Sequence, residues 1–540
     1  MTRPRHPVGE MSWYAWGDPD RATALPDSVR GLLGSVLGVT PHDVPAPAEE
    51  ELRVPPGALP GAARAALAEV VGEAHLDTSD AVRVRHTGGK STPDLLRRRA
   101  GEVSAAPDAV LRPADHAQVE AVLRVCAEQE VAVVPFGGGT SVVGGVEPLR
   151  GRFGALIALD LRRLNRLLHV DPVSRTAALQ AGLRTPEAEE LLAAHGFTLG
   201  HQPQSYEYAT LGGYAATRSA GQSSAGRGRF DAMVLSLRAA TPRGTLDLGR
   251  APGSAAGPDL RQLLLGSEGL FGVVTEVTVR VVPVPEVQRD EAWSFPDFAT
   301  GAAALRRLAQ DGAGLPTVVR LSDEAETFVN AALSGAQEAP TATGGCLAVV
   351  SHEGTAEQVA ARHAETARLL TAAGGSRLGE EPVAHWRHSR YTAPYLRDAL
   401  LAAGVLAETL ETATTWSRLE ELRAEVTGAL TGALATEAGP PVVTCHISHL
   451  YPEGASLYFT VVAAGGDDPL ARWTAAKRAA GDAVAAHGGT VSHHHAVGAD
   501  HRPWMTEEVG EVGVEMLRAV KQALDPVGVL NPGKLIPDGA

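Results

Sequence analysis

The chain has 540 residues, more than a single compact core usually organises, so two or three domains are expected. Hydrophobic residues make up 44% and charged residues 21%, as in folded globular proteins. The formal net charge of −15 argues against nucleic acid as a general partner, because a duplex-binding face needs basic residues to neutralise phosphates.

Three further features describe the cellular setting that we expect. No run of 18 apolar residues occurs, so no membrane-spanning helix is predicted, and residues 1–18 lack the apolar stretch of a signal peptide. Cys126, Cys346 and Cys445 lie far apart without a CxxC pair. This spacing favours a reducing compartment over a disulfide framework or a thiolate metal site, so we expect a cytoplasmic protein.

The first hundred residues differ in character from the rest of the chain. Residues 1–104 are rich in proline and charge, with a helical pattern over 60–71, and are predicted to form an N-terminal extension packed on a larger body. Residues 109–113 and 131–135 are predicted strands, and apolar residues at helical spacing predict a helix over 116–129 between them. Such a strand–helix–strand unit ending in glycines is typical of phosphate-binding α/β folds.

The remaining pattern divides the chain into domains. Strands are predicted at 155–159, 176–179, 234–240 and 273–282, with helices over 185–195 and 260–265. Two prolines at the end of the last strand predict a boundary, which gives a first domain over 105–285. Alternating strands and alanine-rich helices form a second domain over 286–490. The C-terminal segment, 491–540, carries a histidine cluster and an amphipathic helix over 508–524.

A triple-glycine loop, Pro135-Phe-Gly-Gly-Gly-Thr-Ser141, directly follows a buried strand. Glycines let the backbone approach a ligand closely, and consecutive N–H groups can then cradle a pyrophosphate. The loop lacks the spacing of a Rossmann or a Walker motif. A glycine-rich turn without a ligand is the alternative interpretation of this loop alone.

Two more glycine-rich segments occur in the same domain. Gly200-His-Gln-Pro-Gln-Ser-Tyr-Glu-Tyr-Ala-Thr-Leu-Gly-Gly213 continues into Thr217-Arg-Ser-Ala-Gly221, and Leu265-Gly-Ser-Glu-Gly-Leu-Phe-Gly272 leads into a strand. Three such turns in one domain suit a long dinucleotide that contacts several loops. We therefore predict a dinucleotide site here.

These motifs, together with the final Asp525-Pro-Val-Gly-Val-Leu-Asn-Pro-Gly-Lys534, resemble the vanillyl-alcohol oxidase (PCMH-type) flavoprotein superfamily. The resemblance implies an α+β fold, with a two-part PCMH-type FAD-binding domain, an α/β substrate-capping domain and a C-terminal helical segment that returns to the FAD site. The first loop holds no histidine that could tether the cofactor, so the predicted FAD is non-covalent. The motifs place the FAD contacts at Pro135, Phe136, Gly137, Gly138, Gly139, Thr140, Ser141, Gln204, Ser205, Tyr206, Glu207, Tyr208, Ala209, Thr210, Thr217, Arg218, Ser219, Ala220, Glu268, Gly269, Leu270, Phe271, Gly272, Val273 and Val274.

Two branches of the superfamily differ in their C-terminal motifs. D-2-hydroxyacid dehydrogenases supply two histidines and one carboxylate to a metal ion from HxGDGNxH and GEHGxG segments, a ligand set that suits a divalent ion. In this chain Tyr458 stands in place of the second histidine and His494 in place of the glutamate. We therefore predict no metal site.

The same segments resemble the alkyldihydroxyacetonephosphate synthase family instead. Ser492-His-His-His-Ala-Val-Gly498 is similar to its tri-histidine loop, with Ala496 in place of the usual glycine. Segments 11–17, 319–323, 395–398 and 411–416 extend the resemblance over nearly the whole chain. His446 stands where the family has an arginine, which leaves the exact substrate open. The resemblance implies catalytic roles for Tyr458, His493, His494, His495 and His201, and substrate-binding roles for Arg397 and Arg320.

The implied reaction replaces the acyl chain of acyl-dihydroxyacetone phosphate with a fatty alcohol, which makes an ether-lipid precursor without net redox change. Tyr458 could act as the base only if nearby cations lowered its pKa from about 10, and the histidine cluster is the expected source of that charge. Arg397 would bind the phosphate with its planar fork. Without the resemblance, Tyr458 would be interpreted as a packing residue, Arg397 as a surface ion pair, His201 as a loop histidine, and the triple histidine as a metal site or a solvated loop.

Two other functions stay open from the sequence. One is an FAD-dependent D-2-hydroxyacid dehydrogenase, and the other is a flavin-binding protein without turnover. The expected partners are lipid-phosphate and fatty-alcohol substrates, with peripheral contact to a membrane and no nucleic acid. A homodimer is expected by frequency alone.

Overall fold

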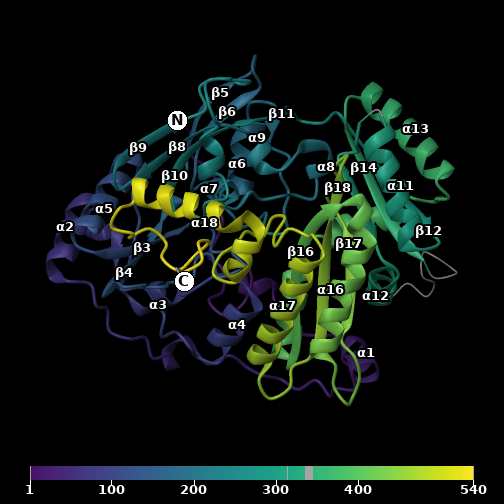
Figure 1. Cartoon of the computed structure of the whole chain (residues 1–540), viewed down its shortest axis with the longest axis horizontal. Helices are drawn as coiled ribbons and strands as arrows, with labels where there is room; N and C mark the ends of the chain where they lie inside the picture. Colours follow the sequence, from purple (N-terminus) through teal and green to yellow (C-terminus); the bar gives the residue numbers. More distant parts are fainter. Residues whose placement is uncertain (1, 313, 335–344, 539–540) are drawn as a thin grey trace.

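The computed structural model describes residues 2–312, 314–334 and 345–538. Figure 1 shows an N-terminal lobe in purple to teal, a second lobe in green, and a yellow C-terminal segment that runs back over the first lobe. Among the described residues, no helix combines the length and apolar character needed to cross a membrane.

The N-terminal lobe contains a four-stranded sheet with the order β1-β2-β4-β3. β2, β4 and β3 run parallel to one another, and β1 is antiparallel to β2. Nearly every residue of β3 and β4 is buried, as expected for parallel strands that read as continuous apolar runs. The elements are β1 (Leu76–Asp77), β2 (Ala109–Leu111), β3 (Val131–Phe136), β4 (Ala155–Asp160), α2 (Gly61–Val71), α3 (Asp80–Arg85), α4 (Thr92–Arg99) and α5 (His116–Glu128).

A five-stranded antiparallel sheet with the order β5-β6-β10-β8-β9 completes this lobe. A two-stranded sheet, β11-β7, lies beside it. The elements are β5 (Leu167–Asp171), β6 (Thr176–Gln180), α6 (Thr185–Ala193), β7 (Phe197–Thr198), α7 (Leu211–Thr217), α8 (Ser224–Arg227), α9 (Phe230–Met233), β8 (Val234–Thr241), β9 (Gly244–Leu248), α10 (Arg261–Leu264), β10 (Val273–Arg280) and β11 (Val282–Pro283).

The second lobe is built on a seven-stranded antiparallel sheet with the order β15-β12-β14-β13-β17-β18-β16. Helices α11, α13, α16 and α17 contribute to one large core with this sheet, whereas α1 and α15 pack on its other face through a separate cluster. The strands are β12 (Val287–Phe295), β13 (Val318–Ser322), β14 (Cys346–Gly354), β15 (Ser376–Gly379), β16 (Val405–Thr415), β17 (Val442–Ile447) and β18 (Gly454–Ala464). The helices are α1 (Asp27–Leu37), α11 (Phe298–Asp311), α12 (Glu324–Ser334), α13 (Ala356–Ala372), α14 (Glu381–Ser389), α15 (Ala393–Ala402), α16 (Leu419–Leu434) and α17 (Pro469–Ala486).

The C-terminal segment ties the two lobes together. It contains α18 (Met505–Leu524), which bends at Gly510, and then a tail in which Asn531 donates a backbone hydrogen bond to Val133 on β3. The yellow ribbon in Figure 1 accordingly crosses the first lobe. One-turn 3₁₀ helices lie at Pro19–Arg21, Glu49–Glu51, Glu73–His75, Leu161–Arg163, Trp416–Arg418 and Arg502–Trp504.

The N-terminal residues are more integrated than the predicted extension. β1 is a strand of the first sheet, and Leu25, Leu33 and Leu37 form a buried cluster with α15 and β16 of the second lobe. The chain therefore crosses both lobes before residue 104. The sequence did not predict this packing, because residues 1–104 are rich in proline and charge and their apolar residues are divided among several short elements. The predicted domain limits at 104, 285 and 490 stay predictions.

Candidate active site

A row of side chains crosses three neighbouring strands of the seven-stranded sheet. Tyr458 on β18 is directly paired with His446 on β17 and with Glu411 on β16. Its neighbours Leu457 and Phe459 belong to the helix-covered core. Because side chains alternate along a strand and directly paired residues share a face, the row lies together on the opposite face of the sheet.

Tyr458 is hydrogen-bonded and stacked within this row. Its hydroxyl donates to Oγ1 of Thr409 over 3.0 Å, and its ring stacks on His446 with centroids 4.8 Å apart. Burial raises the pKa of Tyr458 to about 12, and the carboxylates of Glu408 and Glu411 act in the same direction. The expectation that neighbouring cations lower this pKa is therefore wrong, and Tyr458 is a protonated phenol at neutral pH.

His446, which stands where the resembling family has an arginine, belongs to an ion-pair network. Nη2 of Arg320 lies 2.7 Å from Oε1 of Glu326 and 2.9 Å from Nδ1 of His446. Burial disfavours charge on Glu326, but Arg320 and His446 outweigh it and lower the pKa of this carboxyl. The predicted substrate-binding Arg320 is thus held at the edge of the row by a carboxylate.

The tri-histidine loop is bound to Glu411. The backbone N–H groups of His493, His494 and His495 all donate to the Glu411 carboxylate, at 2.7, 3.1 and 2.8 Å. The rings of His494 and His495 lie 6.1 and 5.6 Å from the Tyr458 ring. The structure therefore brings together four of the five residues predicted to be catalytic.

The charge state of the loop differs from the expectation. Burial lowers the pKa of His493 and the pKa of His495 to about 3 each. Both rings are therefore neutral at physiological pH and do not supply the positive charge expected beside Tyr458. Burial also disfavours charge on Glu411, but the adjoining His494 and the hydrogen bonds from the loop outweigh this and hold the pKa of Glu411 well below its ordinary value.

Two residues beside the loop were not found from the sequence. The Tyr451 hydroxyl lies 2.6 Å from Nε2 of His493, and the His449 ring stacks on His493 at 4.9 Å while Nδ1 of His449 contacts Ser224 of α8. His449, His493 and His494 each offer a nitrogen within 4.8 Å of the others, a set that could ligate a metal ion. The signal that could have found His449 and Tyr451 is their position in the segment that precedes the Tyr458 strand.

The triple-glycine loop has the features that a pyrophosphate of FAD requires. Among the described residues, none of the backbone N–H groups of residues 137–141 has a hydrogen-bond partner. Space beside the loop is tight, because a Cβ on Gly137 would lie 2.3 Å from Oγ1 of Thr210 and one on Gly138 would lie 2.1 Å from the carbonyl oxygen of Tyr208. A close-packed loop with free N–H donors fits an anionic group.

The other predicted FAD-contact segments converge on this loop by different routes. Tyr208 and Thr210 touch it directly, and a Cβ on Gly269 would lie 2.7 Å from Pro135. The Glu268 carboxylate instead accepts backbone N–H groups of Val497 and Gly498, and burial raises its pKa to about 7. Glu268 thus anchors the chain that follows the histidine loop against the glycine-rich turn.

Several residues predicted to contact FAD have side chains that bond to, or pack against, other parts of the protein. The Arg218 guanidinium donates to the Leu265 and Gln262 carbonyls and pairs with Asp231. Leu270, Phe271 and Val274 lie in the core of the five-stranded sheet, and Val273 lies in that of the four-stranded sheet. At these positions the backbone groups, and not the side chains, would contact FAD. The sequence motifs therefore predict the location of the glycine-rich turn, and not which side chains touch the cofactor.

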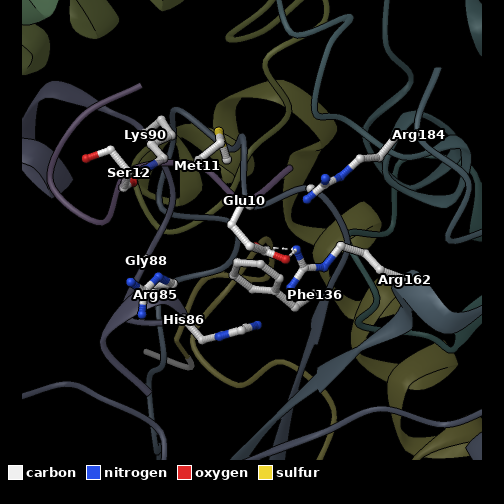
Figure 2. A pocket seen from close by; sticks show the side chains of 12 residues that line it. Glu10, Met11, Ser12, Arg85, His86, Gly88, Lys90, Phe136, Arg162 and Arg184 are labelled. Carbon is white, nitrogen blue, oxygen red and sulfur yellow. Dashed lines mark hydrogen bonds and ion pairs between the residues drawn. The ribbon is translucent and has the colours of Figure 1, made fainter. Parts of the chain in front are cut away.

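A cavity beside Gly138 and Gly139 is lined by residues from the first hundred positions (Figure 2). Glu10 points at Arg162, whose Nη1 lies 2.7 and 2.6 Å from the two carboxylate oxygens. Sequence reasoning missed this wall, although Gly88-Gly89-Lys90-Ser91 was a visible signal of a tight turn before a helix. The additional lining residues are Met11, Ser12, Arg85, His86, Gly88, Lys90, Phe136 and Arg184.

Arg397 lies near this wall rather than in the polar row. Its Nη1 donates to the Lys90 carbonyl over 2.6 Å, while Nε and Nη2 lie 3.2 and 3.1 Å from Oδ1 of Asp398. The Lys90 N–H in turn donates to the carbonyl of Ser141 in the glycine loop over 2.7 Å. A substrate phosphate would have to share this guanidinium with Asp398.

His201 is packed rather than open to a ligand. It is 1% exposed, its Nε2 lies 3.1 Å from Oγ of Ser219, and its ring contacts Tyr214 and Phe230. Burial lowers its pKa to about 3. This geometry favours a role in positioning Ser219 over direct contact with a substrate.

Comparison with known proteins agrees with this geometry. The model of the FAD binding domain matches residues 107–248, and the model of the FAD linked oxidases C-terminal domain matches residues 284–535. Alkyldihydroxyacetonephosphate synthase of Trypanosoma brucei brucei is 33% identical over 98% of this chain and 92% of its own length. That of Dictyostelium discoideum is 31% identical over 98% and 94%.

The same likeness appears in three dimensions. A solved structure of alkyldihydroxyacetonephosphate synthase covers 97% of this chain and 98% of its own, with a TM-score of 0.84 and 29% identity. The predicted α+β flavoprotein fold is confirmed, and FAD is the cofactor of the domain at residues 107–248. The chain belongs to the alkyldihydroxyacetonephosphate synthase family.

Proposed function

We propose that this protein exchanges the acyl chain of acyl-dihydroxyacetone phosphate for a fatty alcohol, with FAD as cofactor and without net redox change. The observation that carries the proposal is the polar row of His446, Tyr458 and Glu411 with the histidine loop held against it. Family membership over the whole chain supports the same reaction.

The exchange makes simple chemical demands on the site. The ester C–O bond breaks and a carboxylate leaves, while the alcohol oxygen forms the ether bond and loses its proton. A proton must also leave the carbon next to the ketone and return to it. One C–O bond of the substrate carbon is replaced by another, so the oxidation state of that carbon is the same before and after the exchange. No external oxidant or reductant is consumed.

Tyr458 and the histidine loop are the groups that we assign to these proton movements. Because burial raises the pKa of Tyr458 to about 12, the phenol enters as a proton donor and can accept only after passing its own proton on. His494 is the proposed acceptor, since the ionised Glu411 lies 3.4 Å from its Nδ1 and stabilises positive charge there.

FAD would supply, when bound, the ring at which the carbon that carries the ester oxygen, next to the ketone, is activated. The chain's own contribution is to hold it: the free N–H groups of residues 137–141 would bind the pyrophosphate, and the histidine loop is joined to this lobe through Glu268. We assign the substrate phosphate to Arg397 and a further substrate contact to Arg320, each of which already pairs with a carboxylate.

The substrates of this reaction are lipids, and we propose that contact with their membrane is peripheral. The cytoplasmic location and the homodimer stay predictions.

The experiment supplies purified holoenzyme with acyl-dihydroxyacetone phosphate and radiolabelled hexadecanol. Label should appear in an ether lipid that resists alkaline hydrolysis. In a separate anaerobic mixture, D-lactate, D-glycolate or D-2-hydroxyglutarate should leave the flavin absorbance unchanged. Bleaching by one of them, without label transfer, would establish the dehydrogenase instead. A protein that binds FAD and does neither would be the flavin-binding alternative.

A further inference from the structure

Glu411 makes an unusual number of contacts with one short loop. Its two carboxylate oxygens accept the backbone N–H groups of His493, His494 and His495, and also the hydroxyl of Ser492 over 2.8 Å. Four donors from consecutive residues therefore converge on a single side chain. A backbone held at three successive positions leaves the loop little freedom to change its register.

This carboxylate is buried and charged. Glu411 is 2% exposed, and the adjoining His494 together with the loop N–H donors keeps it ionised despite its burial. A buried charge is costly unless it is hydrogen-bonded, and here every bond comes from the histidine loop. The sheet thus retains an ionised group at this position whose only partners among the described residues are the loop and its rings.

The position of Glu411 also decides which nitrogen of each ring carries a proton. Nδ1 of His494 lies 3.4 Å from Oε2 of Glu411 and 3.0 Å from Nδ1 of His493. Two imidazole lone pairs cannot face each other at that distance, so one of the two nitrogens carries the hydrogen. The carboxylate favours the N–H on His494, because a negative acceptor strengthens that bond.

A proton on Nδ1 of His494 fixes the tautomers of both rings, His493 and His494. If Nδ1 of His493 accepts, its proton is on Nε2, where it donates to the Tyr451 hydroxyl over 2.6 Å. His494, protonated on Nδ1, keeps a lone pair on Nε2 as the basic atom of the ring. A base whose other nitrogen is oriented by a buried carboxylate is the arrangement that catalytic triads use.

We propose that Glu411 is the positioning residue of the tri-histidine loop, which fixes the backbone of residues 493–495 and holds His494 in the tautomer whose free Nε2 accepts a proton in the exchange reaction. The catalytic part of this inference rests on the proposed function, whereas the tautomer part concerns the protein alone. Glu411 touches no reacting atom; it acts through His494.

The test uses three variants of the FAD-loaded enzyme. Glu411→Gln removes the charge at constant size, and Glu411→Asp keeps the charge on a shorter side chain. Glu408→Gln is the matched control, because Glu408 is also a buried carboxylate on β16 that accepts backbone N–H groups, from Thr92 and Thr409, but lies three residues away and does not contact the loop.

In Glu411→Gln, kcat should fall by roughly 10²-fold or more, the size of a lost general base, while the KM for the phosphate substrate stays close to the wild-type value. Glu411→Asp should restore kcat in part, because it keeps the charged acceptor for the loop N–H groups. Glu408→Gln should keep the ring tautomers of wild type, because Glu408 accepts from Thr92 and Thr409 and not from the loop. An unchanged kcat in Glu411→Gln would overturn the proposal.

A second readout does not depend on activity. Spectra of enzyme with ¹⁵N-labelled histidine, assigned with His493→Gln and His494→Gln, should show the His494 proton on Nδ1 and the His493 proton on Nε2, and Glu411→Gln should lose the first of these. If the tautomers are as stated but no ether forms, the proposed reaction fails and the positioning role stands. If Nδ1 of neither ring carries a proton, or a stoichiometric divalent metal bound by these nitrogens is found by elemental analysis, the tautomer assignment is wrong.

Discussion

Gly138 is the residue at which the smallest change should have the largest effect on cofactor binding. A Cβ at this position would lie 2.1 Å from the carbonyl oxygen of Tyr208 and 2.8 Å from Cα of Ala209. Both neighbours are backbone atoms of the segment that also borders the predicted FAD site. The Gly138→Ala substitution therefore cannot be accommodated by a side-chain rotation.

The size of the effect can be worked out from that distance. An ordinary contact needs at least 3.4 Å, so the glycine loop or the Tyr208 segment must move by about 1.3 Å. Overpacking of this kind costs roughly 1–3 kcal/mol. If the shift falls on the loop whose N–H groups face the pyrophosphate, the Kd for FAD rises by roughly 5–150-fold. The φ angle of Gly138 is not positive, so backbone strain adds nothing.

The assay is a titration of apoprotein with FAD, monitored by quenching of flavin fluorescence. Gly154→Ala is the matched control, because Gly154 lies immediately before β4 and a Cβ there meets nothing within 4 Å. It should bind FAD as wild type does. Equal Kd values for Gly138→Ala and Gly154→Ala, with both proteins folded, would refute the assignment of the loop to the cofactor.

The same geometry leads to four other predictions. Tyr458→Phe should lower kcat by roughly 10²–10⁴-fold with FAD still bound, whereas near-normal turnover would show that the phenol is not the proton donor. Arg397→Ala should raise the KM of the phosphate substrate much more than the Kd of FAD, and an unchanged KM would count against a phosphate role. Acid precipitation should give a colourless pellet, because the glycine loop contains no histidine, and yellow protein would mean a covalent flavin. Burial lowers the pKa of His201 from 6.5 to about 3, so only the unfolded chain takes up a proton between these values. Through this residue wild type should lose about 1.3 kcal/mol of unfolding free energy as the pH falls from 5.5 to 4.5. His201→Gln should show a smaller loss by that amount in urea unfolding at the same two pH values, and equal losses would contradict the burial argument.

Local patterns in the sequence predicted many of the individual elements. The predicted helix over 116–129 corresponds to His116–Glu128, and the strand at 131–135 to Val131–Phe136, because both carry a clear period of apolar residues. The short elements were less exact. The helix expected over 260–265 is a single turn, Arg261–Leu264, since a four-residue segment has no periodicity to read.

The site was predictable only as separate motifs. Tyr458 and the histidine loop were identified from their resemblance to a family, but their shared partner Glu411 was not, although segment 411–416 was part of the same resemblance. Cross-strand register places Glu411 opposite Tyr458, and register is set by pairing across more than forty residues. No local pattern contains that information.

Charge states were the least predictable part. A cluster of three histidines beside a tyrosine suggests positive charge, and the structure has neutral rings instead, because burial lowers the pKa of His493 and of His495. Burial depends on how the two lobes close over the loop, through contacts such as Glu268 with Gly498. A sequence records which groups titrate but not how far each is removed from water.

The most direct test of the account is the mass balance of a single reaction. Holoenzyme is incubated with acyl-dihydroxyacetone phosphate and hexadecanol, and ether lipid, free fatty acid and hydrogen peroxide are each quantified. We predict equal amounts of ether and fatty acid, with no peroxide and no reduced acceptor. Fatty acid released without ether, or peroxide formed in proportion to product, would contradict a non-redox exchange at Tyr458.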